Sequence, residues 1–154
     1  MDFDVWGSWS SSVGPNAPLN DACAPAVDQE GSAVSAVKAW SAAGFPLNRT
    51  ILGVASFGYS FHVNQSSALD ASGNINLYAP FDKSLQPAGD EWDVGVGVDV
   101  CGNPNVVEGR IDFWGLIDAG FLLYDGAVAD GIEYTFDKCG RTVCTPLVLL
   151  YDSN

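Results

Sequence analysis

The strand–helix–strand order of the first 60 residues constrains the fold most strongly. Residues 2–6 alternate apolar and polar side chains, which predicts a short strand. Ser32 is a good helix N-cap, and residues 33–43 contain neither glycine nor proline before Gly44, so a helix is expected there. Residues 50–57 are almost continuously apolar and predict a strand buried on both faces. This order predicts one βαβ unit with parallel strands.

From about residue 61 the pattern changes to short alternating pieces between turn residues. Apolar side chains at helical spacing predict a short helix near residues 112–118. Strands are expected at 92–100, 132–136 and 146–151, although glycines weaken the first of them. The chain is therefore expected to contain two segments, residues 1–60 and 61–154, within one compact α+β unit.

The composition limits the class of ligand. The chain has 154 residues, enough for one domain with a core, and its net charge is −13. Phosphates would be repelled, so neither nucleic acid nor an anionic membrane is expected as a partner. An uncharged ligand such as a sugar, or a cationic one, fits better. No apolar run reaches the roughly 20 residues that a membrane span needs.

Cysteines and glycosylation sequons indicate the secretory pathway. Four cysteines allow three full pairings, and none has the Cys-x-x-Cys spacing of a zinc site. With His62 as the single histidine, neither a metal site nor a cofactor is expected. Asn48 and Asn64 begin N-glycosylation sequons. Residues 1–20 lack the pattern of a signal peptide, so the location of this chain stays open.

Five short motifs carry a family resemblance. They are Met1-Asp2-Phe3-Asp4, Trp6-Gly7-Ser8-Trp9, Gly14-Pro15-Asn16-Ala17-Pro18-Leu19, Leu52-Gly53-Val54-Ala55-Ser56-Phe57-Gly58-Tyr59-Ser60-Phe61, and Tyr134-Thr135-Phe136-Asp137-Lys138-Cys139 followed by Tyr151-Asp152. In this order and spacing they resemble chitinases of glycoside hydrolase family 18, in particular the fungal ones. Phe3 stands where the family's Met-x-Tyr-Asp motif usually has tyrosine.

The resemblance implies a slice of an eight-stranded (β/α) barrel. Residues 1–6 would be its sixth strand, 32–43 the following helix and 50–57 its seventh strand. Residues 61–152 would be the α+β insertion domain of the family, built mostly of antiparallel strands. Strands one to five and the eighth would lie outside this chain. The predicted fold is thus a partial barrel with one βαβ unit, followed by a small α+β domain.

The resemblance also implies chitin hydrolysis, but the catalytic motif is missing. The family's general acid is the glutamate of an Asp-x-x-Asp-x-Asp-x-Glu motif, and the N-acetyl group of the substrate acts as nucleophile. Glu30 is the one glutamate here that has an aspartate two residues before it, Asp28. Four residues before Glu30, where the motif requires a second aspartate, stands Ala26. The chain alone is therefore not expected to be an enzyme. Hydrolysis would need a partner chain that supplies the rest of a barrel, and a protein-interaction or structural role is the other alternative.

Sugar contact is the function that the resemblance leaves to this chain. The Met-x-Tyr-Asp residues and the aromatic residue of the seventh strand line the family's cleft, and the insertion domain forms one wall of it. Phe3 lacks the phenol hydroxyl that would hydrogen-bond a sugar. The expected contacts with a chitin or N-acetylglucosamine oligosaccharide are Met1, Phe3, Asp4, Phe57 and Tyr59, with Trp92 and Trp114 as further candidates from the insertion domain.

Two structural expectations follow from a slice of this kind. Unpaired strand edges invite association, so Phe3, Val5, Ile51 and Val54 should be covered by the insertion domain or by self-association. The expected disulfide is Cys101–Cys139 within the insertion domain, while the pairing of Cys23 and Cys144 stays open. Cys139 and Cys144 are also close enough in sequence to form a bridge.

Overall fold

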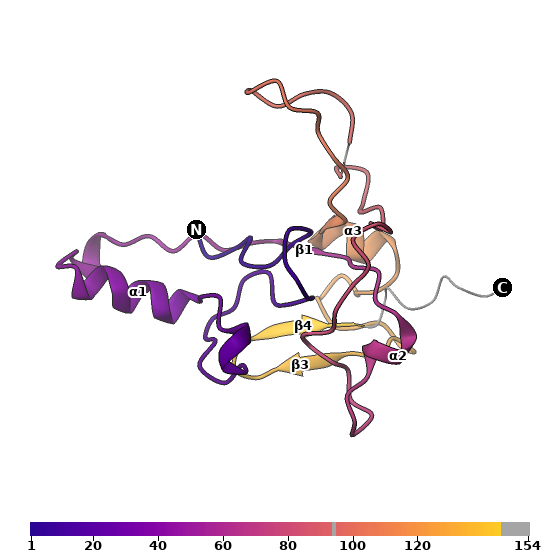
Figure 1. The fold of residues 1–154 in the computed structure, drawn as a ribbon, viewed down its shortest axis with the longest axis horizontal. Coiled ribbons are helices and arrows are strands. Elements are labelled where there is room, and N and C mark those ends of the chain that lie inside the picture. Colours follow the sequence, from indigo (N-terminus) through magenta and orange to yellow (C-terminus); the bar gives the residue numbers. More distant parts are fainter. Residues whose placement is uncertain (94, 146–154) are drawn as a thin grey trace.

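The computed structural model describes residues 1–93 and 95–145 as a small α+β fold with two antiparallel pairs of strands (Figure 1). Strand β1 pairs with β2, and β3 pairs with β4. The antiparallel α+β character predicted from the sequence is confirmed. The elements in chain order are η1 (Ala26–Asp28), α1 (Ala33–Ala42), η2 (Leu47–Arg49), β1 (Phe57–Tyr59), α2 (Gln65–Ala68), β2 (Arg110–Asp112), α3 (Phe113–Asp118), β3 (Thr135–Asp137) and β4 (Thr142–Cys144).

Helix α1 forms where it was predicted, but it buries little of its apolar face. The Ser32 hydroxyl accepts a hydrogen bond from the Ser35 amide at 3.2 Å, and the Ser35 hydroxyl accepts one from the Ser32 amide at 2.8 Å. This reciprocal cap satisfies two backbone donors at the start of the helix. Ala33 is the buried residue of α1, whereas Trp40 is 60% exposed. The helix lies at one end of the molecule, away from the sheets (Figure 1).

The predicted parallel strand pair is wrong in detail. No regular strand forms over residues 2–6, and in the described chain β1 (Phe57–Tyr59) overlaps the second predicted strand, residues 50–57, at Phe57 alone. The two segments still lie side by side, because the Asp2 amide donates to the Gly53 carbonyl at 3.0 Å. Asp4 has a φ of +59°, a left-handed conformation that cannot continue a strand. Strand β1 pairs with β2 instead.

In the second segment, residues 61–154, the predicted helix is confirmed and one predicted strand is wrong. Helix α3 (Phe113–Asp118) forms close to the predicted 112–118, and β3 overlaps the predicted strand at 132–136. Residues 92–100 do not form a strand in the described part. Gly97 has a φ of +99°, and the Asp99 carboxylate accepts the amides of Cys101 and Asn103 at 2.8 Å, which makes a turn. The strand predicted at 146–151 lies outside the described residues.

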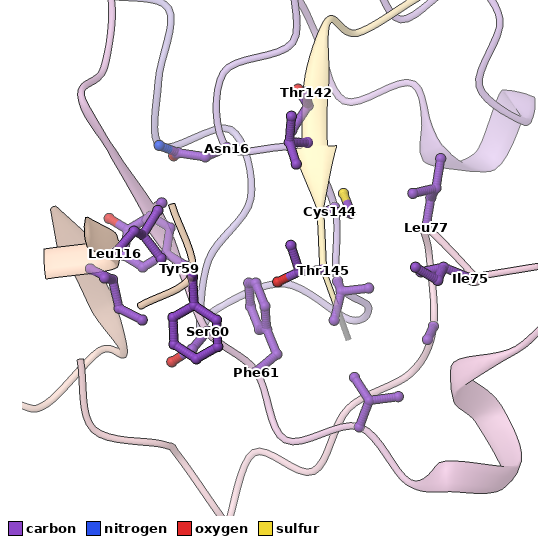
Figure 2. Close-up of a pocket in the computed structure, with 18 of the residues that line it drawn as sticks. Asn16, Tyr59, Ser60, Phe61, Ile75, Leu77, Leu116, Thr142, Cys144 and Thr145 are labelled. Carbon is purple, nitrogen blue, oxygen red and sulfur yellow. The ribbon is translucent and has the colours of Figure 1, made fainter. Parts of the chain in front are cut away.

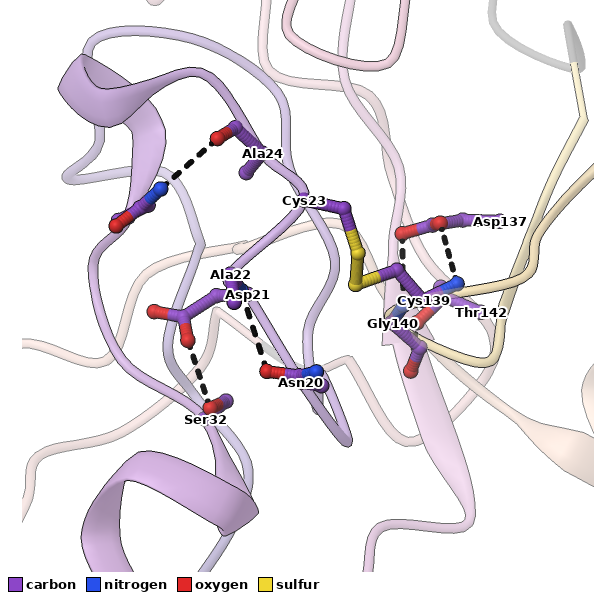
Figure 3. The surroundings of a disulfide bond; sticks show 11 residues. Asn20, Asp21, Ala22, Cys23, Ala24, Ser32, Asp137, Cys139, Gly140 and Thr142 are labelled. Carbon is purple, nitrogen blue, oxygen red and sulfur yellow. Dashed lines mark hydrogen bonds between the residues drawn. A yellow bond between two sulfur atoms is a disulfide. The ribbon is translucent and has the colours of Figure 1, made fainter.

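The disulfide joins the two segments and differs from the predicted one. Cys23 is bonded to Cys139, whereas Cys101 and Cys144 form no disulfide, so the predicted Cys101–Cys139 pair is wrong (Figure 3). The Asp137 carboxylate accepts the amides of Cys139 and Gly140 at 2.9 and 3.0 Å, which fixes the turn after β3. This turn presents Cys139 to the loop after residue 19 rather than to the protruding Cys101 loop.

An apolar face remains without cover. Ile51 is 92% exposed and Val54 is 75% exposed, while Phe3 and Val5 are half-buried. The prediction that the insertion segment folds back over these residues is therefore wrong for Ile51 and Val54. Between η2 and β1 in the described chain, the Gly53 carbonyl accepts from the Asp2 amide at 3.0 Å and the Ser56 carbonyl accepts from the Phe113 amide at 2.7 Å, whereas residues 51, 52, 54 and 55 have no backbone hydrogen-bond partner. This face thus carries both apolar side chains and unpaired backbone groups.

Candidate functional site

Four aromatic rings form a connected cluster between the start of the chain and β1. The ring centroids of Phe3 and Phe57 lie 5.8 Å apart, those of Phe57 and Tyr59 5.8 Å, and those of Tyr59 and Trp9 5.9 Å. All three pairs meet edge to face, a favourable geometry for aromatic rings. Phe57 and Tyr59 are next-but-one neighbours on β1, so their side chains share one face of the strand.

A carboxylate and a phenol lie beside these rings. The Tyr59 hydroxyl donates a hydrogen bond to Asp4 Oδ1 at 2.8 Å. Burial, followed by this hydrogen bond and the charges of Asp4 and Glu108, raises the pKa of Tyr59 well above its usual value, and Arg110 opposes the shift. The phenol therefore stays protonated at neutral pH. The second oxygen of the exposed Asp4 carboxylate is free to accept a hydrogen bond from a ligand hydroxyl.

The expected contact residues do not all meet. Phe3, Asp4, Phe57 and Tyr59 come together, and the Met1 backbone lies beside Gly53 although its side chain is exposed. Trp114 instead lines a separate cleft of about 260 Å³ with Asp90 and Asp118. Trp92 is 60% exposed, and its carbonyl accepts a hydrogen bond from Arg110 Nη2 at 3.1 Å. Among the described residues, neither tryptophan ring contacts the aromatic cluster.

Two residues of the site were not predicted as contacts from the sequence, namely Trp9 of the cluster and Asn16 beneath it. Trp9 is 52% exposed, stacks its edge on Tyr59 and has its carbonyl held by Lys83 Nζ at 3.0 Å. Asn16 is buried directly beneath Asp4 and Phe57. Both residues belong to motifs that carry the family resemblance. The available signal for Asn16 was a polar side chain between two prolines, in the sequence Pro-Asn-Ala-Pro.

A larger cavity lies beside the cluster, between β1, α3 and β4, and Tyr59 and Asn16 are among its lining residues. It has a volume of about 410 Å³ and is lined mainly by apolar side chains such as Phe61, Leu77 and Leu116 (Figure 2). Burial, with a smaller contribution from Asp137, raises the pKa of Cys144 in its wall to about 11. The thiol is therefore protonated and a poor nucleophile at neutral pH. Tyr59 reaches both the cavity and the aromatic cluster.

Neither a metal centre nor a membrane helix is found in the described part of the chain. No group of three histidine, cysteine or acidic side chains is close enough to hold a metal ion there. None of its helices has both the length and the hydrophobicity to span a bilayer. Of the sugar contacts that the resemblance implies, Phe3, Asp4, Phe57 and Tyr59 meet in one place on the described part of the chain.

Two known proteins are similar to this chain over most of its length. The chain is 47% identical over 144 residues to a chitinase-like effector of Moniliophthora roreri and 48% identical over 141 residues to one of Moniliophthora perniciosa. These matches cover 92% and 91% of this chain but 35% and 32% of the relatives, so the chain spans about a third of their length. No family model matches.

The solved structures show the same partial coverage. A chitinase from Rhizomucor miehei superposes with a TM-score of 0.73 and 28% identity, covering 93% of this chain and 37% of that protein. A family 18 chitinase from Cycas revoluta, solved in complex with (GlcNAc)4, gives a TM-score of 0.58 at 19% identity and 31% coverage of that protein.

The chain is therefore a chitinase-related protein. Its fold is part of a glycoside hydrolase family 18 chitinase fold, which confirms the resemblance drawn from its motifs.

Proposed function

We propose that this chain binds chitin oligosaccharides without cleaving them, at the cluster formed by Phe3, Trp9, Phe57, Tyr59 and Asp4. The observation that carries the proposal is the 2.8 Å hydrogen bond between Tyr59 and Asp4 at the edge of a partly exposed aromatic cluster. Aromatic rings suit the apolar C–H face of a pyranose, and the carboxylate accepts from its hydroxyls. This is the usual composition of a small-molecule site, apolar with a few placed polar groups.

The comparisons support the ligand class. The Cycas revoluta chitinase was solved with (GlcNAc)4 and with (GlcNAc)3, and this chain shares part of its fold. The two Moniliophthora relatives carry the name chitinase-like effector rather than chitinase. The net charge of −13 does not oppose an uncharged oligosaccharide.

The missing general-acid motif supports a non-catalytic role. Proton transfer by a positioned acid contributes about 100- to 10,000-fold to hydrolysis. No glutamate of this chain stands in an Asp-x-x-Asp-x-Asp-x-Glu sequence, so this contribution would have to come from residues outside this sequence. The enzymatic alternative thus requires further residues, for example from a partner chain, that complete the barrel.

We expect calorimetric titration with chitotetraose to give saturable heat. Phe57→Ala removes a ring that would cover the sugar, and Asp4→Ala removes its acceptor; each should weaken binding about ten-fold or more. Phe136→Ala is the matched control, because Phe136 is an exposed aromatic on β3 outside the cluster, and it should bind as the wild type does. Absence of heat at millimolar chitotetraose would refute the proposed site. Release of shorter sugars on long incubation would refute the non-catalytic role.

A second candidate function is association through the uncovered apolar face. The exposed Ile51 and Val54, with Trp40 on α1, favour it. We expect the apparent mass in sedimentation to rise with concentration, and the double variant I51K/V54K to stay monomeric because lysines block a strand edge. V100K on the protruding loop is the control and should associate as the wild type does, since Val100 is fully exposed elsewhere. A wild-type protein that is monomeric at every concentration would exclude this function.

Two further proposals concern the maturation and organisation of the chain. We propose that it passes through the secretory pathway, where the Cys23–Cys139 disulfide can form and where Asn48 and Asn64, both exposed, can be glycosylated. We also propose that residues 1–60 and 61–154 fold as one unit. The disulfide and the hydrogen bonds from Val13 to Ala79 and from Leu19 to Gly140 support this.

A further inference from the structure

Asn16 is a buried polar residue beneath the aromatic cluster. Its exposed fraction is 9%, and it lies on the loop 14–19 within the first segment, residues 1–60. A buried amide costs free energy unless its donors and acceptors are paired. The hydrogen-bond partners of Asn16 therefore identify the backbone segments that its side chain stabilises.

Asn16 bonds to both segments of the proposed sugar site. Its Oδ1 accepts from the Asp4 amide at 2.9 Å, and its Nδ2 donates to the Phe57 carbonyl at 3.0 Å. Its backbone carbonyl also accepts from the Val5 amide at 3.1 Å. The amide orientation is fixed by chemistry, because the Asp4 N–H can only donate and the Phe57 carbonyl can only accept.

The hydrogen bonds of Asn16 connect residues 1–5 with residues 53–57, where the regular backbone ladder of a strand pair is missing in the described chain. Residues 1–5 and 53–57 share one direct backbone hydrogen bond, from Asp2 to Gly53, among the described residues. Asp4 is also held at a φ of +59°, which costs free energy for any residue other than glycine. The Asn16 side chain stabilises this backbone and so directs the Asp4 carboxylate towards the Tyr59 hydroxyl.

We propose that Asn16 is a positioning residue for sugar recognition, which sets Asp4 against Phe57 and Tyr59 without touching the ligand itself. This inference rests on the proposed sugar-binding function for its ligand. The structural part of the inference, that Asn16 controls the conformation of Asp4, does not depend on any sugar. Asn16→Ala removes both side-chain bonds, whereas Asn16→Asp keeps the acceptor for Asp4 and loses the donor for Phe57.

The sugar-free test follows the Asp4 backbone by NMR. In Asn16→Ala the ¹³Cα and ¹³Cβ shifts of Asp4 should leave the values of a left-handed residue, and in Asn16→Asp they should be retained. Ser60→Ala is the control, because the buried Ser60 hydroxyl donates one hydrogen bond, to the Gly109 carbonyl at 3.1 Å, and its loss should leave Asp4 unchanged. Unchanged Asp4 shifts in folded Asn16→Ala would overturn the inference.

The sugar-dependent test is a double-variant cycle in chitotetraose titrations. Asn16→Ala should weaken binding about ten-fold, as Asp4→Ala does, and the double variant should be no worse than either alone. Ser60→Ala should bind as the wild type does. Fully additive losses would contradict a positioning role. If the wild type binds no sugar while the Asp4 shifts still respond to Asn16→Ala, the proposed sugar-binding function is refuted. The structural part of the inference, that Asn16 controls the conformation of Asp4, is then supported.

Discussion

Replacement of Cys23 and Cys139 by serine is expected to lower the free energy of unfolding by about 4 to 5 kcal/mol. The disulfide closes a loop with a sequence separation of 116, and a cross-link over such a loop removes much of the entropy of the unfolded chain. For a chain of this length the loss corresponds to a decrease of roughly 10 to 20 °C in melting temperature. Thermal unfolding followed by circular dichroism measures it, with the reduced wild type as a second comparison.

Cys101→Ser is the matched control for this prediction. Cys101 is exposed and forms no disulfide, so its replacement should change stability by less than about 0.5 kcal/mol. A non-reducing peptide map should recover Cys23 and Cys139 in one linked pair. A linked Cys101, or equal stability of the disulfide variant and the wild type, would contradict the assigned pairing.

Replacement of Trp6 by alanine is expected to cost about 3 to 5 kcal/mol of stability. Trp6 is 3% exposed, its ring centroid lies 5.7 Å from that of Tyr78, and a Cβ at Gly14 would overlap it. It thus joins the first segment to the second and supports the loop that carries Asn16. Chemical denaturation monitored by fluorescence measures the loss, and Trp6→Phe, which should cost less, serves if the alanine variant does not fold.

Trp9→Ala is the matched control, because the same residue type lies three positions further and is 52% exposed. Its replacement should cost less stability, about 1 kcal/mol, since about half of the residue is already exposed. It should nevertheless weaken sugar binding, because Trp9 belongs to the aromatic cluster. Equal stability losses for Trp6→Ala and Trp9→Ala would show that Trp6 is not the core residue described here.

Local signals in the sequence were sufficient to predict the helices. Ser32 and the Gly- and Pro-free run after it predict α1, and the apolar spacing near residue 113 predicts α3. Helix α1 nevertheless buries little, because Ala33 is buried whereas Trp40 is 60% exposed. Helix formation depended on local caps, whereas burial depended on other segments.

The strand predictions failed where single residues override an alternating pattern. Asp4 adopts a left-handed conformation, and its amide donates to Asn16 Oδ1 rather than to a neighbouring strand, so the alternation of residues 2–6 does not produce a strand. Gly97 and the Asp99 turn interrupt the alternation of residues 92–100 in the same way. Backbone conformations of this kind depend on side-chain partners that periodicity does not reveal.

The proposed site was predictable in part, through the resemblance rather than through the residue pattern. Phe3, Asp4 and Phe57 come together as the family motifs imply, yet Trp92 and Trp114 lie apart from them. The disulfide could not be chosen among the possible pairings, because the thiols that meet are set by tertiary contacts. Asn16 was not singled out, since its partner Phe57 lies 41 residues away in sequence.

The most direct test of the central claim is a titration of the ¹⁵N-labelled chain with chitotetraose, followed by amide shifts in two-dimensional NMR. Sugar binding at the aromatic cluster predicts progressive, saturable changes at Phe3, Asp4, Trp9, Phe57 and Tyr59, with helix α1 and the β3–β4 hairpin unchanged. A spectrum that does not move at millimolar sugar, or changes confined to the surroundings of Trp92 and Trp114, would contradict the account.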